Sequence, residues 1–290
     1  MSKNIIKDNQ AIDLHVHTTA SDGSMTPEEV VKSAVDTGLS AIAITDHDTI
    51  DGFIQAKDIA RTYSLELVPG IEISTKYHTN IHILGYYVNH LESQLRYELN
   101  SIIEERDIRN RSICKLMCND GIPADYEIMK LRFGPVIGRP HFARILIEAG
   151  HAGNVQEAFS KYLDKGQRYF LPRNLMRIER AVDVIRCSGG IPVLAHPLQY
   201  QLDDDLLQKL VRHCMDFGLQ GIECMYSGYL PEQTEYLKAL AHRYGLLMTG
   251  GSDFHGTAKP WIQLGRGCGS LFVPYSMLDQ LKKRREKESE

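Results

Sequence analysis

The run that most constrains the fold is Asp13-Leu14-His15-Val16-His17-Thr18, in which polar and apolar side chains alternate near the N-terminus. Alternation with a period of two is typical of a β-strand, whose successive side chains point to opposite faces. Asp13, His15 and His17 therefore share a face, and two imidazoles one strand step apart can bind one metal ion. We expect Asp13 to accept the spare ring N–H of such a ligand. Taken alone, the run also fits a strand with two buried, hydrogen-bonded histidines.

The residues that follow predict an α/β fold. A polar loop leads to a helix that begins at Thr26-Pro27-Glu28-Glu29, where threonine caps the first turn and proline occupies its first position. A buried strand is predicted at 39–44, and it ends in Thr45-Asp46-His47-Asp48. Active sites of α/β barrels lie at the carboxyl ends of the strands, so this polar ending predicts a functional site there.

Two more predicted strands carry an isolated polar residue. After a helix at 50–64, the strand at 65–74 is broken by Pro69-Gly70 and carries Glu72, and the strand at 80–88 carries His82. A charge buried in an apolar strand must be paired or bound to a metal. Glu72 and His82 are therefore expected at the same site as His15 and His17.

The alternation stops between residues 91 and 174, where the sequence predicts mainly helices. We expect this segment to form a helical cap inserted between two parts of a barrel, residues 1–90 and 175–290. Gly138-Arg139-Pro140-His141 opens one helix of the segment, where backbone N–H groups and a guanidinium can hold an anion. The predicted helices of the cap span 91–120, 139–149 and 154–164.

Alternation resumes near Asn174. The strand at 191–195 ends in His196-Pro197, and the strand at 246–249 leads into Ser252-Asp253-Phe254-His255. One more strand is predicted at 221–225, and helices are predicted at 176–188, 203–217, 231–244 and 275–287.

Composition narrows the class of protein. The net charge of −4 argues against a general nucleic-acid-binding surface. The six cysteines form no Cys-x-x-Cys pair, and no segment has the length and apolarity of a membrane span or a signal peptide. We therefore expect a cytoplasmic enzyme with reduced thiols and no membrane partner, and a loose arm at residues 1–10.

The polar residues at the predicted strand ends share one chemistry. Imidazoles and carboxylates without cysteine suit zinc, manganese or iron, and their number exceeds the need of one tetrahedral ion. We expect two or three divalent ions at this end of the barrel. The candidate ligands are His15, His17, Asp22, His47, Glu72, His82, His196, Asp253 and His255.

The blocks around His15, His47, His196 and Asp253, in this order and spacing, resemble the signature blocks of the PHP (polymerase and histidinol phosphatase) family. The segments Gly70–Ser74, Ile81–Tyr86 and Gly138–His141 are similar to a stand-alone subgroup of nucleoside 3′,5′-bisphosphate phosphatases and 5′→3′ exonucleases on short RNA. The resemblance implies a distorted seven-stranded (β/α) barrel with a trinuclear site, most often of manganese.

The resemblance also implies roles for single residues. The first ion would bind His15, His17, Glu72 and Asp253; the second would bind Glu72, His82 and His196; the third would bind Asp22, His47 and His255. We assign catalysis to His15, His17, Glu72, His196, Asp253 and His255. Substrate binding is assigned to Arg139, His141 and Arg168, with Lys165 of Lys165-Gly166-Gln167-Arg168 as the alternative to Arg168.

Such a site suits hydrolysis of a phosphomonoester of a small nucleotide by metal-activated hydroxide, without a covalent intermediate. The expected partner is a nucleoside 3′,5′-bisphosphate or a short RNA end rather than duplex DNA, because a cap would cover the barrel mouth. The alternatives are a 5′→3′ exonuclease on short RNA, a histidinol-phosphate phosphatase, and a non-catalytic metal- or phosphate-binding module.

Overall fold

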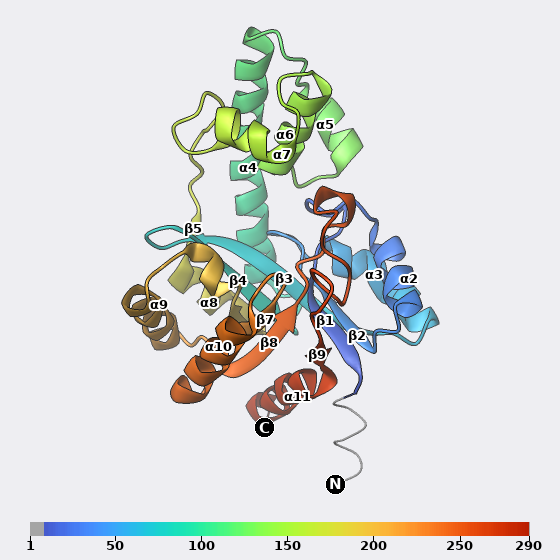
Figure 1. The fold of residues 1–290 in the computed structure, drawn as a ribbon, viewed down its shortest axis with the longest axis vertical. Helices are drawn as coiled ribbons and strands as arrows, with labels where there is room; N and C mark the ends of the chain where they lie inside the picture. The colour runs from blue at the N-terminus through green and yellow to red at the C-terminus, as the bar shows by residue number, and fades with distance from the viewer. Residues whose placement is uncertain (1–8, 290) are drawn as a thin grey trace.

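The computed structural model of the chain describes residues 9–289, so most of the predicted N-terminal arm lies outside the described residues. Within them the chain forms an α/β barrel with helices around it and a helical cap above one end (Figure 1). The strands are β1 (Ala11–Val16), β2 (Ala41–Ile44), β3 (Glu66–Lys76), β4 (Asn80–Tyr86), β5 (Met176–Arg177), β6 (Ile191–Leu194), β7 (Gly221–Tyr226), β8 (Leu247–Gly251) and β9 (Val273–Pro274).

Seven of these strands form the barrel wall, which confirms the predicted architecture. The sheet runs β8-β7-β6-β4-β3-β2-β1, and the two-residue β9 pairs with the far side of β1. The wall nearly closes where β1 meets the residues after β8: the backbone N–H of His17 donates to the Phe254 carbonyl at 2.9 Å, and that of Asp253 donates to the His15 carbonyl at 2.8 Å. The two ends of the sheet therefore bring the first and last histidine blocks together.

Strand β4 runs against its neighbours β3 and β6, whereas the other neighbouring pairs of the seven-strand wall are parallel. His82 stands near the start of β4, and this start lies at the barrel end where the parallel strands finish. The break predicted at Pro69-Gly70 is not an end of a strand, because β3 is continuous from Glu66 to Lys76. Instead β3 changes partner there, from β2 over residues 66–69 to β4 over residues 70–76.

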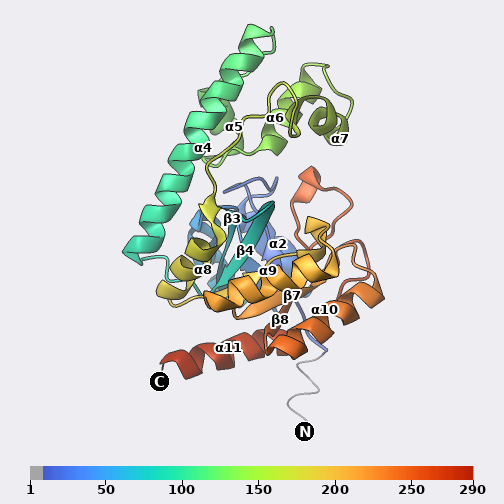
Figure 2. The same ribbon diagram turned by 90° about the vertical axis from the view of Figure 1, so that its left-hand side faces the viewer.

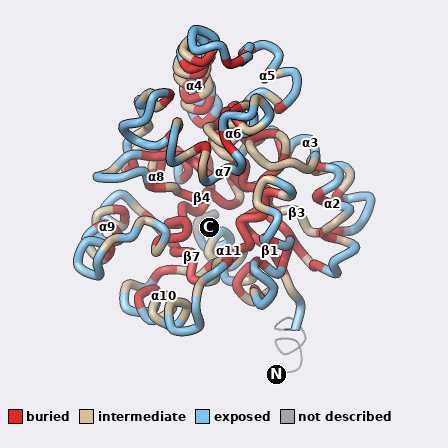
Figure 3. Tube along the Cα trace, turned by 45° about the horizontal axis from the view of Figure 1, so that its top comes forward, coloured by how far each residue is buried: buried red, intermediate tan, exposed pale blue. Residues whose placement is uncertain are grey.

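Helices cover the outside of the barrel, and buried residues gather on the strands and on the inner helix faces (Figure 3). None of the described helices has the length and apolarity that crossing a bilayer requires. The helices are α2 (Pro27–Asp36), α3 (Asp51–Thr62), α4 (Ser93–Asn119), α5 (Tyr126–Phe133), α6 (Arg139–Glu148), α7 (Val155–Ala158), α8 (Ile178–Cys187), α9 (Asp204–Asp216), α10 (Pro231–Tyr244) and α11 (Tyr275–Ser289).

The long helix α4 connects the barrel to the cap (Figure 2). Its first half packs Leu95 and Leu99 into the core beneath α8, and its second half packs Ile113 and Met117 into a separate core within the cap. Two details of the cap differ from the sequence prediction. Helix α5 was not predicted, and the helix predicted at 154–164 is a short α7 followed by a π-helical turn at Phe159–Leu163.

Candidate metal centre

The structure brings all nine candidate ligands together at the capped end of the barrel. Their ligand atoms form overlapping groups, and the atoms within each group lie within 4.8 Å of one another. The groups are His15, His17 and Asp253; His15, Glu72 and His196; His47, Glu72 and His82; and His17, Asp22, His47 and His255. The set predicted for the third ion falls within one group, while the set predicted for the second is divided between two. Assignment of ligands to individual ions stays a prediction.

Positive φ angles occur in the backbone at several strand ends that carry the candidate ligands. His196 and Asp253 have positive φ angles of 25° and 57°, and so does Asp48, next to His47, at 56°. Side chains of L-residues rarely adopt this left-handed region, and such strain concentrates at functional sites. The chain therefore turns sharply at three strand ends that supply or adjoin candidate ligands.

Glu72 lies at the centre of the cluster with 1% of its side chain exposed. Its Oε1 atom is 2.9 Å from His82 Nδ1 and 2.9 Å from His196 Nε2, and its Oε2 atom is 2.9 Å from His47 Nδ1. Burial alone would raise the pKa of Glu72, but the surrounding imidazoles outweigh it and hold that pKa well below its usual value. Because each of its two oxygens lies against at least one imidazole, the Glu72 carboxylate could hold a cation on either oxygen.

The buried polar atoms of the cluster fit bound metal ions. The Nε2 atoms of His15 and His17 face each other at 3.2 Å. The buried atoms His17 Nδ1, His47 Nδ1 and Glu72 Oε2 make no hydrogen bond of acceptable geometry among the described residues, even though His47 Nδ1 and Glu72 Oε2 lie 2.9 Å apart, whereas buried polar groups normally make one. Cations between these nitrogen and oxygen atoms would satisfy them, and the absence of sulfur suits manganese, zinc or iron.

A carboxylate that was not predicted orients the first histidine. Glu223, on β7, is fully buried, accepts a hydrogen bond from the His196 backbone N–H at 2.7 Å, and lies 3.0 Å from His15 Nδ1. Burial alone would lower the pKa of His15, but the charges of Glu223, Glu72 and Asp253 raise it well above its usual value. A carboxylate behind a ligating imidazole fixes the ring's tautomer and direction.

The role predicted for Asp13 is wrong. Its carboxylate accepts hydrogen bonds from the backbone N–H groups of Ser252 and Gly265, both at 2.8 Å, rather than from an imidazole ring. Asp13 is two residues before His15 on β1, and it contacts the loop after β8, in which these buried N–H groups need an acceptor. It therefore holds that loop in place, and Glu223 takes the role expected of Asp13.

Asp253 is held from both sides. Its Oδ1 atom faces the cluster, 3.3 Å from His17 Nε2, while its Oδ2 atom accepts hydrogen bonds at 2.7 Å from the Tyr226 hydroxyl and from Lys259 Nζ. Burial alone would raise the pKa of Asp253, but Lys259 and the nearby histidines keep it well below its usual value. One oxygen therefore stays directed at the cluster.

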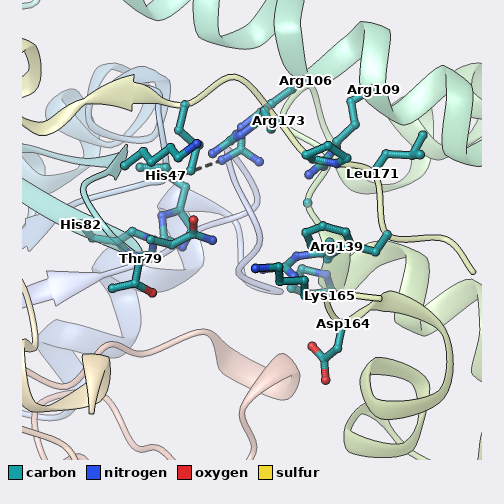
Figure 4. A pocket seen from close by; sticks show the side chains of 18 of the residues that line it. His47, Thr79, His82, Arg106, Arg109, Arg139, Asp164, Lys165, Leu171 and Arg173 are labelled. Atoms are coloured by element: carbon teal, nitrogen blue, oxygen red, sulfur yellow. Dashed lines mark hydrogen bonds between the residues drawn. The ribbon is translucent and has the colours of Figure 1, made fainter. Parts of the chain in front are cut away.

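Beside the cluster lies a cavity of about 790 Å³ between the barrel and the cap (Figure 4). His47, His82 and Asp22 line the barrel side. The cap side is strongly basic, and its cationic residues are Arg106, Arg109, Arg139, Lys165 and Arg173. Three of these five residues, Arg106, Arg109 and Arg173, were not singled out in the sequence, because they come from a helix and a connecting segment that only the tertiary fold brings together.

The three predicted substrate-binding residues occupy different positions. Arg139 lines the cavity, with its guanidinium 5.6 Å from the centre of the Phe159 ring and 6.0 Å from that of Phe170. His141 is outside the cavity lining, and its Nδ1 accepts a hydrogen bond at 2.9 Å from the Gly138 backbone N–H.

Arg168 is also absent from the cavity lining. Its guanidinium donates to both carboxylate oxygens of Asp120 at 3.0 Å on the exposed side of the cap. The ion pair turns Arg168 away from the cavity. Lys165, three residues earlier, lines the cavity instead.

Comparisons with known proteins agree with these features. The sequence pattern of the PHP domain matches residues 13–176. The 5′-3′ exoribonuclease Rnm of Salmonella typhimurium is 40% identical over 266 residues, covering 90% of this chain and 89% of the relative. A 3′,5′-nucleoside bisphosphate phosphatase of Chromobacterium violaceum is 33% identical over 258 residues, which cover 88% of this chain and 90% of the relative. The crystal structure of a proposed metal-dependent phosphoesterase of Bifidobacterium adolescentis superposes with a TM-score of 0.84 at 28% identity, covering 95% of this chain and 96% of that one.

Proposed function

The chain belongs to the PHP domain family, and on that premise we propose that it hydrolyses phosphoester bonds of a small nucleotide, with a nucleoside 3′,5′-bisphosphate as the first candidate substrate. One observation carries the proposal: the cavity has the cluster of imidazoles and carboxylates on one wall and guanidinium groups on the facing wall. A nucleotide with two phosphates matches both walls. The phosphate to be removed would lie at the cluster, and the other would lie against the cap.

The five cationic residues of the cap side form a basic wall that is only partly neutralised, because the Asp48 carboxylate pairs with Arg106 and Arg173 alone. Arg109 donates to the uncharged Asn110 side chain, and Arg139 makes no ion pair with a carboxylate of the described residues. Burial and the neighbouring guanidinium groups lower the pKa of Arg109 to about 9. Such crowding of like charge is relieved by an anion, and guanidinium groups bind phosphate oxygens in pairs.

Two or three divalent ions, manganese in the first place and zinc or iron as alternatives, would supply a nucleophilic water at neutral pH and neutralise charge on the phosphoryl group. The proposed ligands are the nine residues of the cluster. Glu223 keeps the His15 ring directed at the ions, and Tyr226 and Lys259 keep Asp253 Oδ1 directed there. Arg139, and Lys165 in place of Arg168, would bind the distal phosphate.

A second candidate is 5′→3′ exonuclease activity on short RNA. The observation that favours it is the 40% identity to a relative named as an exoribonuclease. Both activities would use the same cluster of ligands and the same basic wall. They differ in whether the phosphate at the cluster is terminal, as in the bisphosphate, or is esterified to a further nucleotide, as in RNA. Because the cap stands over the barrel mouth, duplex DNA is not an expected substrate (Figure 2).

The first experiment compares substrates of the manganese-loaded protein. Adenosine 3′,5′-bisphosphate, a 5′-phosphorylated oligoribonucleotide and histidinol phosphate are incubated separately, and released phosphate and nucleotide are quantified. Preference for the bisphosphate with loss of the 3′-phosphate supports the first candidate. Release of mononucleotides from the oligomer supports the second, and metal binding without hydrolysis of any of them would refute both.

Two variants test the walls separately. His196→Ala should abolish hydrolysis while the circular dichroism spectrum keeps its shape, because it removes a proposed ligand at the end of β6. Arg139→Met should raise KM for the bisphosphate about 10- to 100-fold, the loss expected for a charge-assisted bond to phosphate. Arg144→Met is the matched control, because Arg144 lies on the same helix and pairs with Glu148 outside the cavity.

A further inference from the structure

Trp261 is the chain's only tryptophan, and 65% of it is exposed. It lies in the loop that follows β8 and the short turn at Gly256–Ala258. This loop rises from the barrel end toward the cap in two perpendicular views (Figures 1 and 2). The loop that carries Trp261 therefore begins at the end of the barrel that faces the cap.

The loop is fixed in place on both sides of Trp261. Two residues before it, Lys259 donates to the Asp253 carboxylate at 2.7 Å. After it, Ile262 and Leu264 are 7% and 5% exposed and belong to the barrel core. The indole is thus held outward by buried neighbours, which makes it a pre-positioned surface.

The same loop links Trp261 to the cluster. Lys259 contacts the candidate ligand Asp253, and the Cα atoms of Lys259 and Trp261 can be at most about 7 Å apart. The cap, with its basic residues Arg139 and Lys165, stands on the other side of the cavity. A substrate with phosphates in the cavity and a chain extending out of it would leave between the cap and this loop.

We propose that Trp261 is a stacking platform for a nucleobase of a short oligoribonucleotide bound at the site. This inference rests on the proposed function and selects the oligomer over the mononucleotide as the substrate class. Proteins that bind single strands combine a basic groove for the phosphates with exposed aromatic rings on which bases stack. The basic cap wall and the indole are these two parts, and an isolated nucleotide inside the cavity would use only the first.

The single tryptophan provides a direct measurement, because the intrinsic indole fluorescence of the whole protein comes from Trp261. The manganese-loaded protein is titrated with 5′-phosphorylated tetraadenylate carrying phosphorothioate linkages that resist hydrolysis. Base stacking predicts saturable quenching at the concentrations where the anisotropy of a labelled copy of the oligomer reports binding. Binding by anisotropy without a change in fluorescence would overturn the proposal.

Kinetics test the role in selectivity. Trp261→Ala should lower the ratio of kcat/KM for the oligomer to kcat/KM for adenosine 3′,5′-bisphosphate about 5- to 150-fold, the range for loss of one stacked base. Trp261→Phe should restore most of that ratio. Tyr97→Ala removes another exposed aromatic ring, which is 73% exposed on α4, and should leave the ratio unchanged.

Equal losses on both substrates would overturn the proposal, because a residue that only supports the loop affects both. If the wild-type protein hydrolyses neither substrate, the proposed function fails. In that case the fluorescence titration still decides whether Trp261 stacks on bases.

Discussion

Replacement of Asp48 tests whether its two buried ion pairs join the cap to the barrel. Asp48 is fully buried, and its Oδ2 atom accepts hydrogen bonds from Arg106 on α4 and from Arg173 in the segment that returns to the barrel. Its Oδ1 atom accepts a hydrogen bond from the Ser74 backbone N–H at 2.7 Å. The exposed fractions of the Arg106 and Arg173 side chains are only 8% and 10%, so solvent screens these charges little.

Asp48→Ala should lower the free energy of unfolding by about 4 kcal/mol, because removal of one partner leaves buried charges without compensation. Asp48→Asn keeps an acceptor oxygen and a side chain that tolerates the positive φ of 56°, and should cost about 2 kcal/mol. Urea unfolding at pH 7 measures both values. Asp58→Ala is the control, because Asp58 pairs with Arg61 in solvent and its loss should leave stability unchanged. A cost below about 1 kcal/mol for Asp48→Ala would refute the reasoning.

The ion pairs of Asp48 also predict how the free energy of unfolding depends on pH. Burial alone would raise the pKa of Asp48, but Arg106 and Arg173 outweigh it and hold the pKa below its usual value. A group whose pKa is lowered by folding contributes stability that is fully present above its unfolded pKa of about 4. The difference in stability between wild type and Asp48→Asn should therefore be constant from pH 5 to pH 7 and shrink as the pH falls below about 4. A difference that grows at low pH would contradict the assigned cause.

Glu223→Gln should weaken Mn²⁺ binding about 10- to 100-fold in calorimetric titrations, because Glu223 fixes the His15 ring without being one of the nine proposed ligands; unchanged affinity would remove that role. Chelation of metal should lower the melting temperature and addition of Mn²⁺ should restore it, because an ion that binds only the folded chain stabilises it; equal melting curves would argue against the site. Ellman's reagent should titrate three thiols rapidly in the folded protein and six in denaturant, and a fourth rapid thiol would contradict the burial of Cys114, Cys214 and Cys224.

The candidate ligands at the strand ends could be predicted from the sequence because each stands out from its immediate neighbours. A carboxylate or imidazole within an apolar run is costly unless it has a partner, and this rule located Glu72 in Ile71-Glu72-Ile73. The same signal stands in Ile222-Glu223-Cys224, so the rule that identified Glu72 could also have identified Glu223. Asp13 shows the limit of such reasoning. The alternation predicts correctly that Asp13 is on the same face of its strand as His15, but it does not predict which groups of the folded protein contact the Asp13 carboxylate.

The basic wall could not be predicted from local patterns. Arg106 and Arg109 are three residues apart on a helix that is charged along much of its length, and nothing in that spacing distinguishes a cavity-facing arginine from a solvated one. Arg173 lies in a segment without regular structure. Their convergence depends on the angle at which α4 leaves the barrel, which packing in two separate cores determines.

Asp48 links the candidate ligands, which could be predicted from the sequence, to the basic residues of the cap, which could not. It directly follows His47, a proposed ligand, and its backbone N–H donates to the Glu72 carbonyl at 2.9 Å, so its main chain is part of the candidate metal centre. Its side chain holds Arg106 and Arg173, so its carboxylate belongs to the cap. A displacement of α4 that moves Arg106 must therefore act on the loop that carries His47. The wall proposed to bind the distal phosphate and the cluster proposed to hold the metal are consequently joined through Asp48, and changes in the cap are expected to alter metal binding as well as substrate choice.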